Sequence, residues 1–308
     1  MKNMSTSFFK RLSRDLLKNK SLYLMLLPVI LFYLIFCYFP IYGTQIAFRD
    51  FNPRKGIYGS EWVGLENFIS FFKGIYFTRL VRNTLIINIL NLILGFPAPI
   101  ILALLLNEVR HLRFKKFIQT VSYLPHFIST VVVAGMIMQF VSTEGFITKL
   151  LTLFGFAQKN LLTNPDLFRP IYISSDIWQG IGWGSIIYIA AISGINSELY
   201  EAAKIDGAGK FKQVLNVTIP GILPTIITML ILRIGTMMSI GYEKIILLYN
   251  SSIYETADVI SSYVYRKGLL DLDYSFSTAV DLFNSVINLI LLFSANKICK
   301  KLTENSLW

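Results

Sequence analysis

A charged segment at residues 196–220 interrupts a chain that is mostly apolar on either side of it. Asn196 or Ser197 can cap a helix there, and acidic residues follow where they favour the positive end of the helix dipole. Gly207 suits the end of that helix, and Pro220 suits the first turn of the next one. At helical spacing a small, shallow face then forms, which is typical of a surface that docks against another protein. That face comprises Leu199, Ala202 and Ala203.

The same segment contains the nearest imitation of a nucleotide-binding loop. A P-loop needs a glycine, four residues and then Gly-Lys-Ser/Thr, so that backbone amides can wrap a phosphate. Residues 207–211 read Gly-Ala-Gly-Lys-Phe, which lacks the first glycine at the right distance and the final hydroxyl. We therefore expect this chain to bind no cofactor itself, and we expect ATP and Mg²⁺ to be bound by a partner subunit.

Catalytic and metal-binding residue types do not gather at a spacing that predicts a site. His111 lies in a basic loop and His126 follows a proline, so we interpret both as loop or packing residues. Cys37 and Cys299 lie at opposite ends of the chain and form neither a metal-binding nor a disulfide pattern. We expect a protein that is not an enzyme and that holds no metal.

The composition places the chain in a membrane. Of its 308 residues 54% are hydrophobic and only 15% are charged, which is more apolar surface than a soluble protein of this length could bury. The formal net charge of +11 would suggest nucleic acid in a soluble protein, but no RNA- or DNA-binding motif is present. The basic residues are therefore read as signals of membrane orientation.

Six apolar stretches predict an all-α integral membrane protein. They form one membrane domain at residues 21–298, between a basic N-terminal segment at 1–20 and a tail at 299–308. Pro97 and Pro99 are expected to kink the second span. The longer connections, at 47–82, 143–170 and 243–275, are expected to be outer segments. The predicted spans cover about 22–46, 83–106, 117–141, 171–195, 221–242 and 276–296.

Six spans would place both termini on one side of the membrane. The segments on that side hold sixteen lysines and arginines, the longer outer segments hold twelve, and Arg233 lies inside a span. Because basic residues favour the cytoplasmic side, we expect the N-terminus, the C-terminus and the 196–220 segment to face the cytoplasm.

Polar residues inside the predicted spans could contact a solute. Hydrocarbon makes them costly, so they are expected to face the interior of the bundle. They either hydrogen-bond between helices or line a path for a hydroxyl-rich cargo, in which tryptophans could stack on a sugar ring. The first interpretation is favoured for any single asparagine, whereas Arg233 and Asp281 favour a functional or paired role. The candidate path comprises Asn88, Asn91, Trp178, Gln179, Arg233, Asp281, Asn284 and Asn288.

The charged segment resembles the EAA loop of importer-type ABC transporter permeases. That pattern is Glu-Ala-Ala, three residues, Gly, nine residues and then Ile-x-Leu-Pro. Glu201-Ala202-Ala203 and Gly207 match it, and Val217-Thr218-Ile219-Pro220 is aliphatic where the pattern is aliphatic. The competing interpretation is an ordinary cytoplasmic helix-turn-helix between two spans.

Other stretches resemble one branch of these permeases, the oligosaccharide type of the carbohydrate uptake family, a lipoprotein-B-like and maltose-type group. The similarity extends over nearly the whole chain. Asp281 departs from it, since a small residue such as glycine is expected there. The stretches that carry the resemblance are 62–68, 248–250, 254–260, 263–265 and 283–290.

The resemblance implies a six-span type I ABC importer permease (MetI-like) in the bacterial cytoplasmic membrane. Its implied partners are a second homologous permease chain, two ATP-binding subunits, an extracytoplasmic solute-binding protein, a carbohydrate and membrane lipid. The loop would then be a coupling helix that docks in a cleft of the ATP-binding subunit. The residues implied in coupling are Glu201, Ala202, Ala203, Lys204, Asp206, Gly207 and Pro220.

A stand-alone secondary transporter or channel is the alternative from another class. It would need ion-coupling acids in broken spans and often an internal repeat. No clear inverted repeat is visible, and Asp281 is taken as the only obvious acid in the middle of a span.

Overall fold

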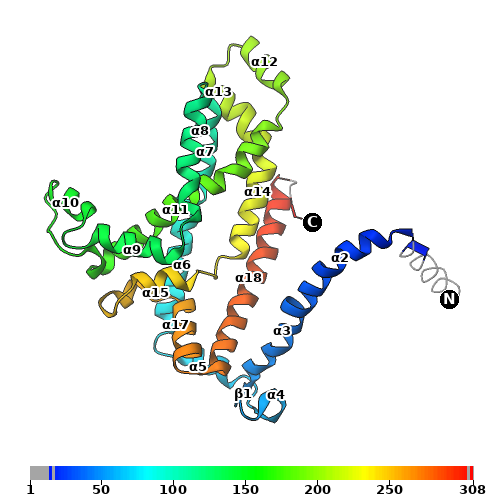
Figure 1. Ribbon diagram of the computed structural model, residues 1–308, viewed down its shortest axis with the longest axis vertical. Helices are drawn as coiled ribbons and strands as arrows, with labels where there is room; N and C mark the ends of the chain where they lie inside the picture. Colours follow the sequence, from blue (N-terminus) through cyan, green and yellow to red (C-terminus); the bar gives the residue numbers. More distant parts are fainter. Residues whose placement is uncertain (1–13, 16–17, 304–305, 308) are drawn as a thin grey trace.

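The structure is a computed structural model that describes residues 14–15, 18–303 and 306–307, and most of these residues lie in helices (Figure 1). Part of the predicted N-terminal segment, including Lys2, Lys10 and Arg11, lies outside the described residues. Two short strands, β1 (Arg49–Asp50) and β2 (Glu61–Trp62), pair antiparallel with Arg49 opposite Trp62. The described part of the chain is therefore mostly helical, as predicted, with one short strand pair that the sequence did not indicate.

The first predicted span forms a continuous helical rod from Lys20 to Phe48. It consists of α2 (Lys20–Phe32), a π-helical turn (Tyr33–Tyr38), α3 (Phe39–Ile41) and a 3-10 segment (Tyr42–Phe48). Figure 1 shows α2 leaning away from the other helices, so that its apolar side chains are exposed on all sides. A rod this apolar belongs in lipid or against another apolar surface.

π-helical turns precede three of the prolines that lie inside long helices. They cover Tyr33–Tyr38 before Pro40, Asn91–Gly95 before Pro97, and Val214–Thr218 before Pro220. Proline lacks an N–H and its ring clashes with the carbonyl four residues earlier, and a widened turn relieves that clash. The interruption predicted in the second span takes this form, between α6 (Phe77–Leu90) and α7 (Pro97–Glu108).

The third predicted span, 117–141, was wrong as a single helix. It divides into α8 (Leu112–Tyr123), a 3-10 turn (Leu124–Phe127) and α9 (Thr130–Val141). Pro125 ends the first helix, and the Ser129 hydroxyl caps the second by accepting from the Val132 amide. Figure 1 shows α8 along the long axis of the molecule and α9 crossing it.

The fourth predicted span forms α11 (Pro165–Ser193), a 29-residue helix capped by Asn164. It is long enough to cross a membrane, but its charged and polar residues make it less apolar than the other long helices. Membrane crossing by length and composition is therefore supported for five helical stretches of the described residues, and not for the full six. These are Lys20–Phe48, Phe77–Glu108, Thr130–Thr152, Lys210–Gly235 and Tyr274–Lys301.

The fifth predicted span, 221–242, was wrong at both ends. Helical structure begins with α13 (Lys210–Gln213), continues through α14 (Ile219–Gly235) and stops at Gly235. The Asn288 side chain, near the middle of α18 (Tyr274–Thr303), accepts from the Met238 amide at 2.8 Å and donates to the Ser239 hydroxyl at 2.9 Å. The non-helical segment 236–241 therefore lies against the middle of the last span, where its polar groups need protein partners.

The segment predicted as an outer loop at 243–275 is largely helical and contributes to the core. It contains α15 (Tyr242–Leu248), α16 (Tyr254–Ala257) and α17 (Ile260–Tyr265), followed by a π-helical turn (Arg266–Leu270). Apolar side chains with helical periodicity pack here against α9 and α11, and this packing outweighs the polar composition. The outer segment at 143–170 likewise includes α10 (Phe146–Thr152). Side chains that 243–275 buries include Ile245, Leu248, Ile253, Val259 and Ile260.

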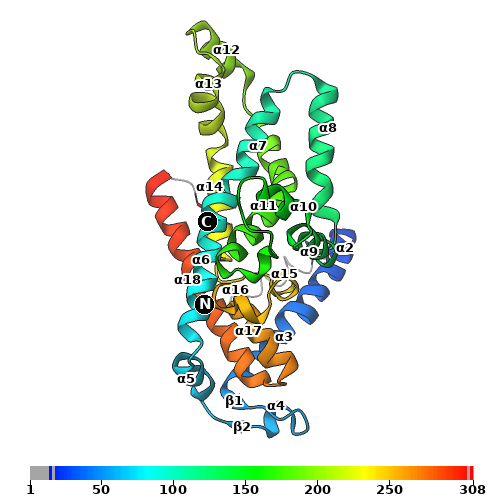
Figure 2. The ribbon, with the colours of Figure 1, turned by 90° about the vertical axis from the view of Figure 1, so that its left-hand side faces the viewer.

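The two ends of the molecule differ in character. One end carries α12 (Ser197–Ile205) and the turn between α7 and α8; the other carries the two strands, α4 (Gly56–Gly59) and α5 (Glu66–Lys73) (Figures 1 and 2). The last turn of α18 points toward the α12 end, and its first turn lies beside α5.

Candidate functional site

Helix α12 begins and ends where the residue types predicted. The Asn196 side-chain oxygen accepts from the Glu198 amide at 3.0 Å. At the other end Gly207 has a φ of +75°, the left-handed conformation that glycine adopts without strain. The Ala208 amide then donates to the Ala203 carbonyl at 2.8 Å and closes the helix. The predicted cap and stop are confirmed.

The surface of α12 is open to a partner. The Leu199 side chain is 54% exposed and that of Ile205 is 86% exposed, so apolar groups stand out at the tip of the molecule. Figure 2 shows α12 projecting beyond the other helices. Of the predicted coupling residues, Ala203 is half-buried and Pro220 lies inside the continuous helix that begins at Lys210. The exposed ones are Glu201, Ala202, Lys204, Asp206, Gly207 and Pro220.

Several polar contacts fix this projection to the bundle. The Tyr200 and Thr218 hydroxyls are hydrogen-bonded at 3.0 Å, and Gln213 donates to the Ala208 carbonyl at 2.8 Å. Lys210 and Glu108, the last residue of α7, form an ion pair at 2.9 Å. Tyr200 thus joins α12 to the helical stretch that begins at Lys210, and the Lys210–Glu108 pair joins that stretch to the end of α7. Sequence reasoning missed Glu108, which only the fold brings close to the loop.

A cavity with a few polar residues in a mostly apolar lining lies where the second, fourth and fifth predicted spans meet. Its volume is about 440 Å³, and Asn91, Asp176 and Arg233 line it. A smaller cavity of about 120 Å³ shares these three residues and adds Asn88 and Ser239. The structure thus brings together three members of the predicted path, namely Asn88, Asn91 and Arg233.

Asp176 makes the main polar contacts of this site. The Asn91 amide donates to its carboxylate at 2.6 Å, and the Lys244 ammonium lies 3.7 Å from the other oxygen. The Lys244 side chain is only 7% exposed and lies over the Tyr172 ring, 5.4 Å from its centre. The carboxylate is therefore compensated by a hydrogen bond and a buried cation.

Sequence reasoning missed Asp176 and Lys244. Taking Asp281 as the only acid in a predicted span was wrong, because Asp176 lies inside the predicted fourth span. A systematic search for charges in spans would have found Asp176. Lys244 could not be found in this way, because it lies in a segment that was predicted as an outer loop. Only the fold shows that α15 packs inside the bundle.

The other predicted path residues lie apart from this cavity. Asn288 binds the end of the fifth span, and Asn284 is buried with its side-chain oxygen unpaired. Asp281 lines a different cavity of about 310 Å³, beside the stacked Tyr242 and Tyr265 rings. Trp178 lines an apolar pocket, and Gln179 donates to the Ile128 carbonyl at 3.3 Å.

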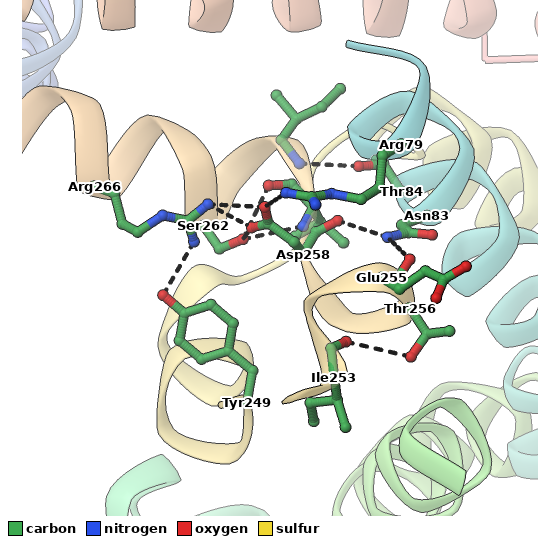
Figure 3. A network of polar contacts seen from close by, with 12 residues as sticks. Arg79, Asn83, Thr84, Tyr249, Ile253, Glu255, Thr256, Asp258, Ser262 and Arg266 are labelled. Carbon is green, nitrogen blue, oxygen red and sulfur yellow. Dashed lines mark hydrogen bonds and ion pairs between the residues drawn. The ribbon is translucent and has the colours of Figure 1, made fainter. Parts of the chain in front are cut away.

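A buried ionic network fixes the connection between the fifth and sixth spans (Figure 3). Asp258 has no exposed surface and pairs with Arg79 at 2.9 Å and Arg266 at 2.8 Å. The Ser262 hydroxyl also donates to it, at 2.8 Å. Burial alone would lower the pKa of Arg266, but its hydrogen bonds to Asp258 and Tyr249 raise it. These contacts join α6 to α16 and α17.

Comparison with known proteins decides the class of this fold. Residues 95–296 match the family described as "Binding-protein-dependent transport system inner membrane component". The chain belongs to this family. Members are inner membrane components of transport systems and not enzymes, which agrees with the exposed α12 and with the apolar spans. Within the described residues no group of three or more His, Cys, Asp or Glu side chains is arranged to hold a metal ion.

Individual members of the family are similar over nearly the whole chain. The "Polygalacturonan/rhamnogalacturonan transport system permease protein YteP" of Bacillus subtilis (strain 168) is 45% identical, over 97% of this chain and 94% of that protein. "Protein LplB" from the same organism is 46% identical, over 94% and 92%. A solved bacterial alginate ABC transporter, in complex with an alginate pentasaccharide-bound periplasmic protein, contains a chain with a TM-score of 0.88 and 43% identity. That match covers 96% of this chain and all of the other.

Proposed function

We propose that this chain is the permease subunit of an ATP-driven importer that takes up an oligosaccharide. Its membership of a binding-protein-dependent transport family supports a role in import, and the names of its relatives support a carbohydrate cargo. The observation that carries the proposal is α12, a capped and projecting helix with the Glu-Ala-Ala motif on the side of the bundle opposite the strands.

In this proposal α12 docks on a separate ATP-binding subunit. Closure of two such subunits on ATP would push on α12, and the Lys210–Glu108 pair would pass the movement to the second and fifth spans. The bundle would then alternate between two packed states, open to either side of the membrane. ATP and Mg²⁺ belong to that partner.

The proposed assembly contains further partners. A second homologous permease chain would form a heterodimer with this one and cover the apolar surfaces that face away from lipid. A solute-binding protein would deliver the sugar at the end of the molecule that carries β1 and β2. Both termini and α12 would lie in the cytoplasm, with the basic turn between α7 and α8 on the same side.

A stand-alone secondary transporter is less well supported. Asp176, the acid that lines the cavity, already accepts a hydrogen bond from Asn91 and lies beside Lys244, so it is not free to couple an ion. The family assignment also favours a system with a binding protein.

Gentle purification from the native membrane tests the proposal. We expect an ATP-binding subunit and a second permease to co-elute, and we expect both the Glu201→Arg and the Gly207→Pro variant to lose the ATP-binding subunit. Elution of the chain alone, together with solute movement in vesicles that lack ATP, would overturn the proposal and favour the secondary transporter.

A further inference from the structure

Arg233 presents an unpaired positive charge to the cavity that Asn91 and Asp176 also line. Arg233 lines both the larger cavity and the smaller one. It lies two positions before α14 ends at Gly235. Among the described residues no carboxylate forms an ion pair with Arg233, and no side chain or carbonyl accepts a hydrogen bond from its guanidinium. Arg233 is exposed, so its unpaired guanidinium is accessible from the cavity. Ionisable residues inside membrane-spanning segments commonly mark a ligand site or a pathway.

The one acid lining the cavity does not neutralise Arg233. Asp176 accepts from Asn91 at 2.6 Å and lies 3.7 Å from the buried Lys244 ammonium. Asn91 and Lys244 therefore engage Asp176, and among the described residues neither cavity lining holds another carboxylate that could pair with Arg233.

The position of Arg233 suits a ligand group better than a structural role. The non-helical segment 236–241 follows it, and this segment is held to the middle of α18 by Asn288. Irregular backbone at that depth is tolerated where it lines a cavity. A volume of about 440 Å³ falls within the usual range of small-molecule sites.

Resting on the proposed function, we infer that the cargo is an acidic oligosaccharide and that Arg233 binds a uronic acid carboxylate as it passes through this cavity. A guanidinium matches a carboxylate with two parallel hydrogen bonds. Asn88 and Ser239 line the smaller cavity that Arg233 also lines, where they can meet sugar hydroxyls. A neutral sugar would leave the Arg233 charge uncompensated.

Transport by the complete importer tests this inference. The reconstituted complex, with its own binding protein, is given trimers of galacturonate or mannuronate and the methyl esters of both, which keep their shape but lose their charge. Because the same binding protein serves every variant, its own selectivity cancels in the comparison. We expect Arg233→Gln to lower ATP-driven uptake of a transported acidic trimer by about tenfold or more, while uptake of its ester stays at the wild-type level.

Arg233→Lys is the matched variant that keeps the charge. It should retain more acidic uptake than Arg233→Gln, because it keeps the attraction but loses the two-pronged geometry. Equal loss of acid and ester in Arg233→Gln would mean that Arg233 supports folding or pairs with an acid of the partner permease, and would overturn the inference. Unchanged uptake of both would overturn it as well.

Failure of the proposed function would look different. A wild-type complex that moves no oligosaccharide, acidic or neutral, would overturn the importer proposal and this inference with it. A wild-type complex that moves only neutral oligosaccharides would overturn the inference alone.

Discussion

At the scale of single residues, Gly207 and Asp258 illustrate two different constraints. Gly207 is required for its backbone conformation, since a φ of +75° is open to glycine and strained for other residues. Asp258 is required for its charge, since two arginines are partly buried around it. Neither constraint involves catalysis, yet each makes one position intolerant of change.

Substitution of Gly207 should uncouple transport without preventing membrane insertion. Proline cannot adopt the observed φ, because its ring fixes that angle near −65°, so the end of α12 must rearrange in Gly207→Pro. We expect ATP-driven uptake to fall by at least about tenfold at equal membrane abundance. Gly209→Ala is the control, since its φ is −66° and an added methyl group meets open space. Wild-type uptake by Gly207→Pro would contradict this account.

Removal of the Asp258 charge should destabilise the fold. Asp258→Asn leaves Arg79 and Arg266 without their shared counterion, and breaking a buried pair in this way costs roughly 3–5 kcal/mol. Thermal unfolding of the detergent-solubilised complex measures this as a lower Tm. The matched control is Asp271→Asn, which removes an exposed pair with Lys267 and should change stability by less than about 1 kcal/mol. Equal Tm values for both variants would rule out a stabilising role for the network.

At the scale of elements, close packing of α11 on α8 depends on one glycine. A methyl group at Gly182 would overlap the backbone of Ser122, whereas one at Gly180 would meet no heavy atom within 4 Å. Small residues allow such close approach between membrane helices. Two glycines on the same helix thus have different requirements that their spacing alone does not reveal.

The Gly182→Ala variant should therefore be less stable than Gly180→Ala. Overpacking against backbone that cannot move costs typically about 1–3 kcal/mol, whereas alanine in open helix surface is neutral or slightly stabilising. Thermal unfolding of the two purified variants, measured side by side, tests the difference. A Gly182→Ala protein as stable as Gly180→Ala would show that α8 is free to shift.

At the scale of the whole molecule, orientation in the membrane is the prediction to test. Tyr58 is 77% exposed at the strand end and Ile205 is 86% exposed at the α12 end. In a variant without Cys37 and Cys299, a cysteine at Tyr58 should react with an impermeant thiol reagent added to spheroplasts. One at Ile205 should react only after the membrane is opened. The reverse pattern would place α12 outside and exclude its contact with an ATP-binding subunit.

The sequence by itself determined the class of protein and the coupling helix. Apolar composition requires a membrane protein, and the α12 signals are local, since a cap, a small-residue face and a glycine stop act within a few residues of one another. The pattern of apolar stretches also located most long helices, although Pro125 divided the third and the fifth ended at Gly235.

Only the tertiary structure decided which polar residues meet. Asn91, Asp176, Arg233 and Lys244 come from four separate segments, and spacing along one helix says nothing about its neighbours. Asn288 shows the same limit, because its partner is the broken end of another helix. Burial of 243–275 also depended on the fold, since its helices gain their stability by packing on α9 and α11. Long-range packing in the bundle therefore set the polar centre, whereas local backbone chemistry set α12.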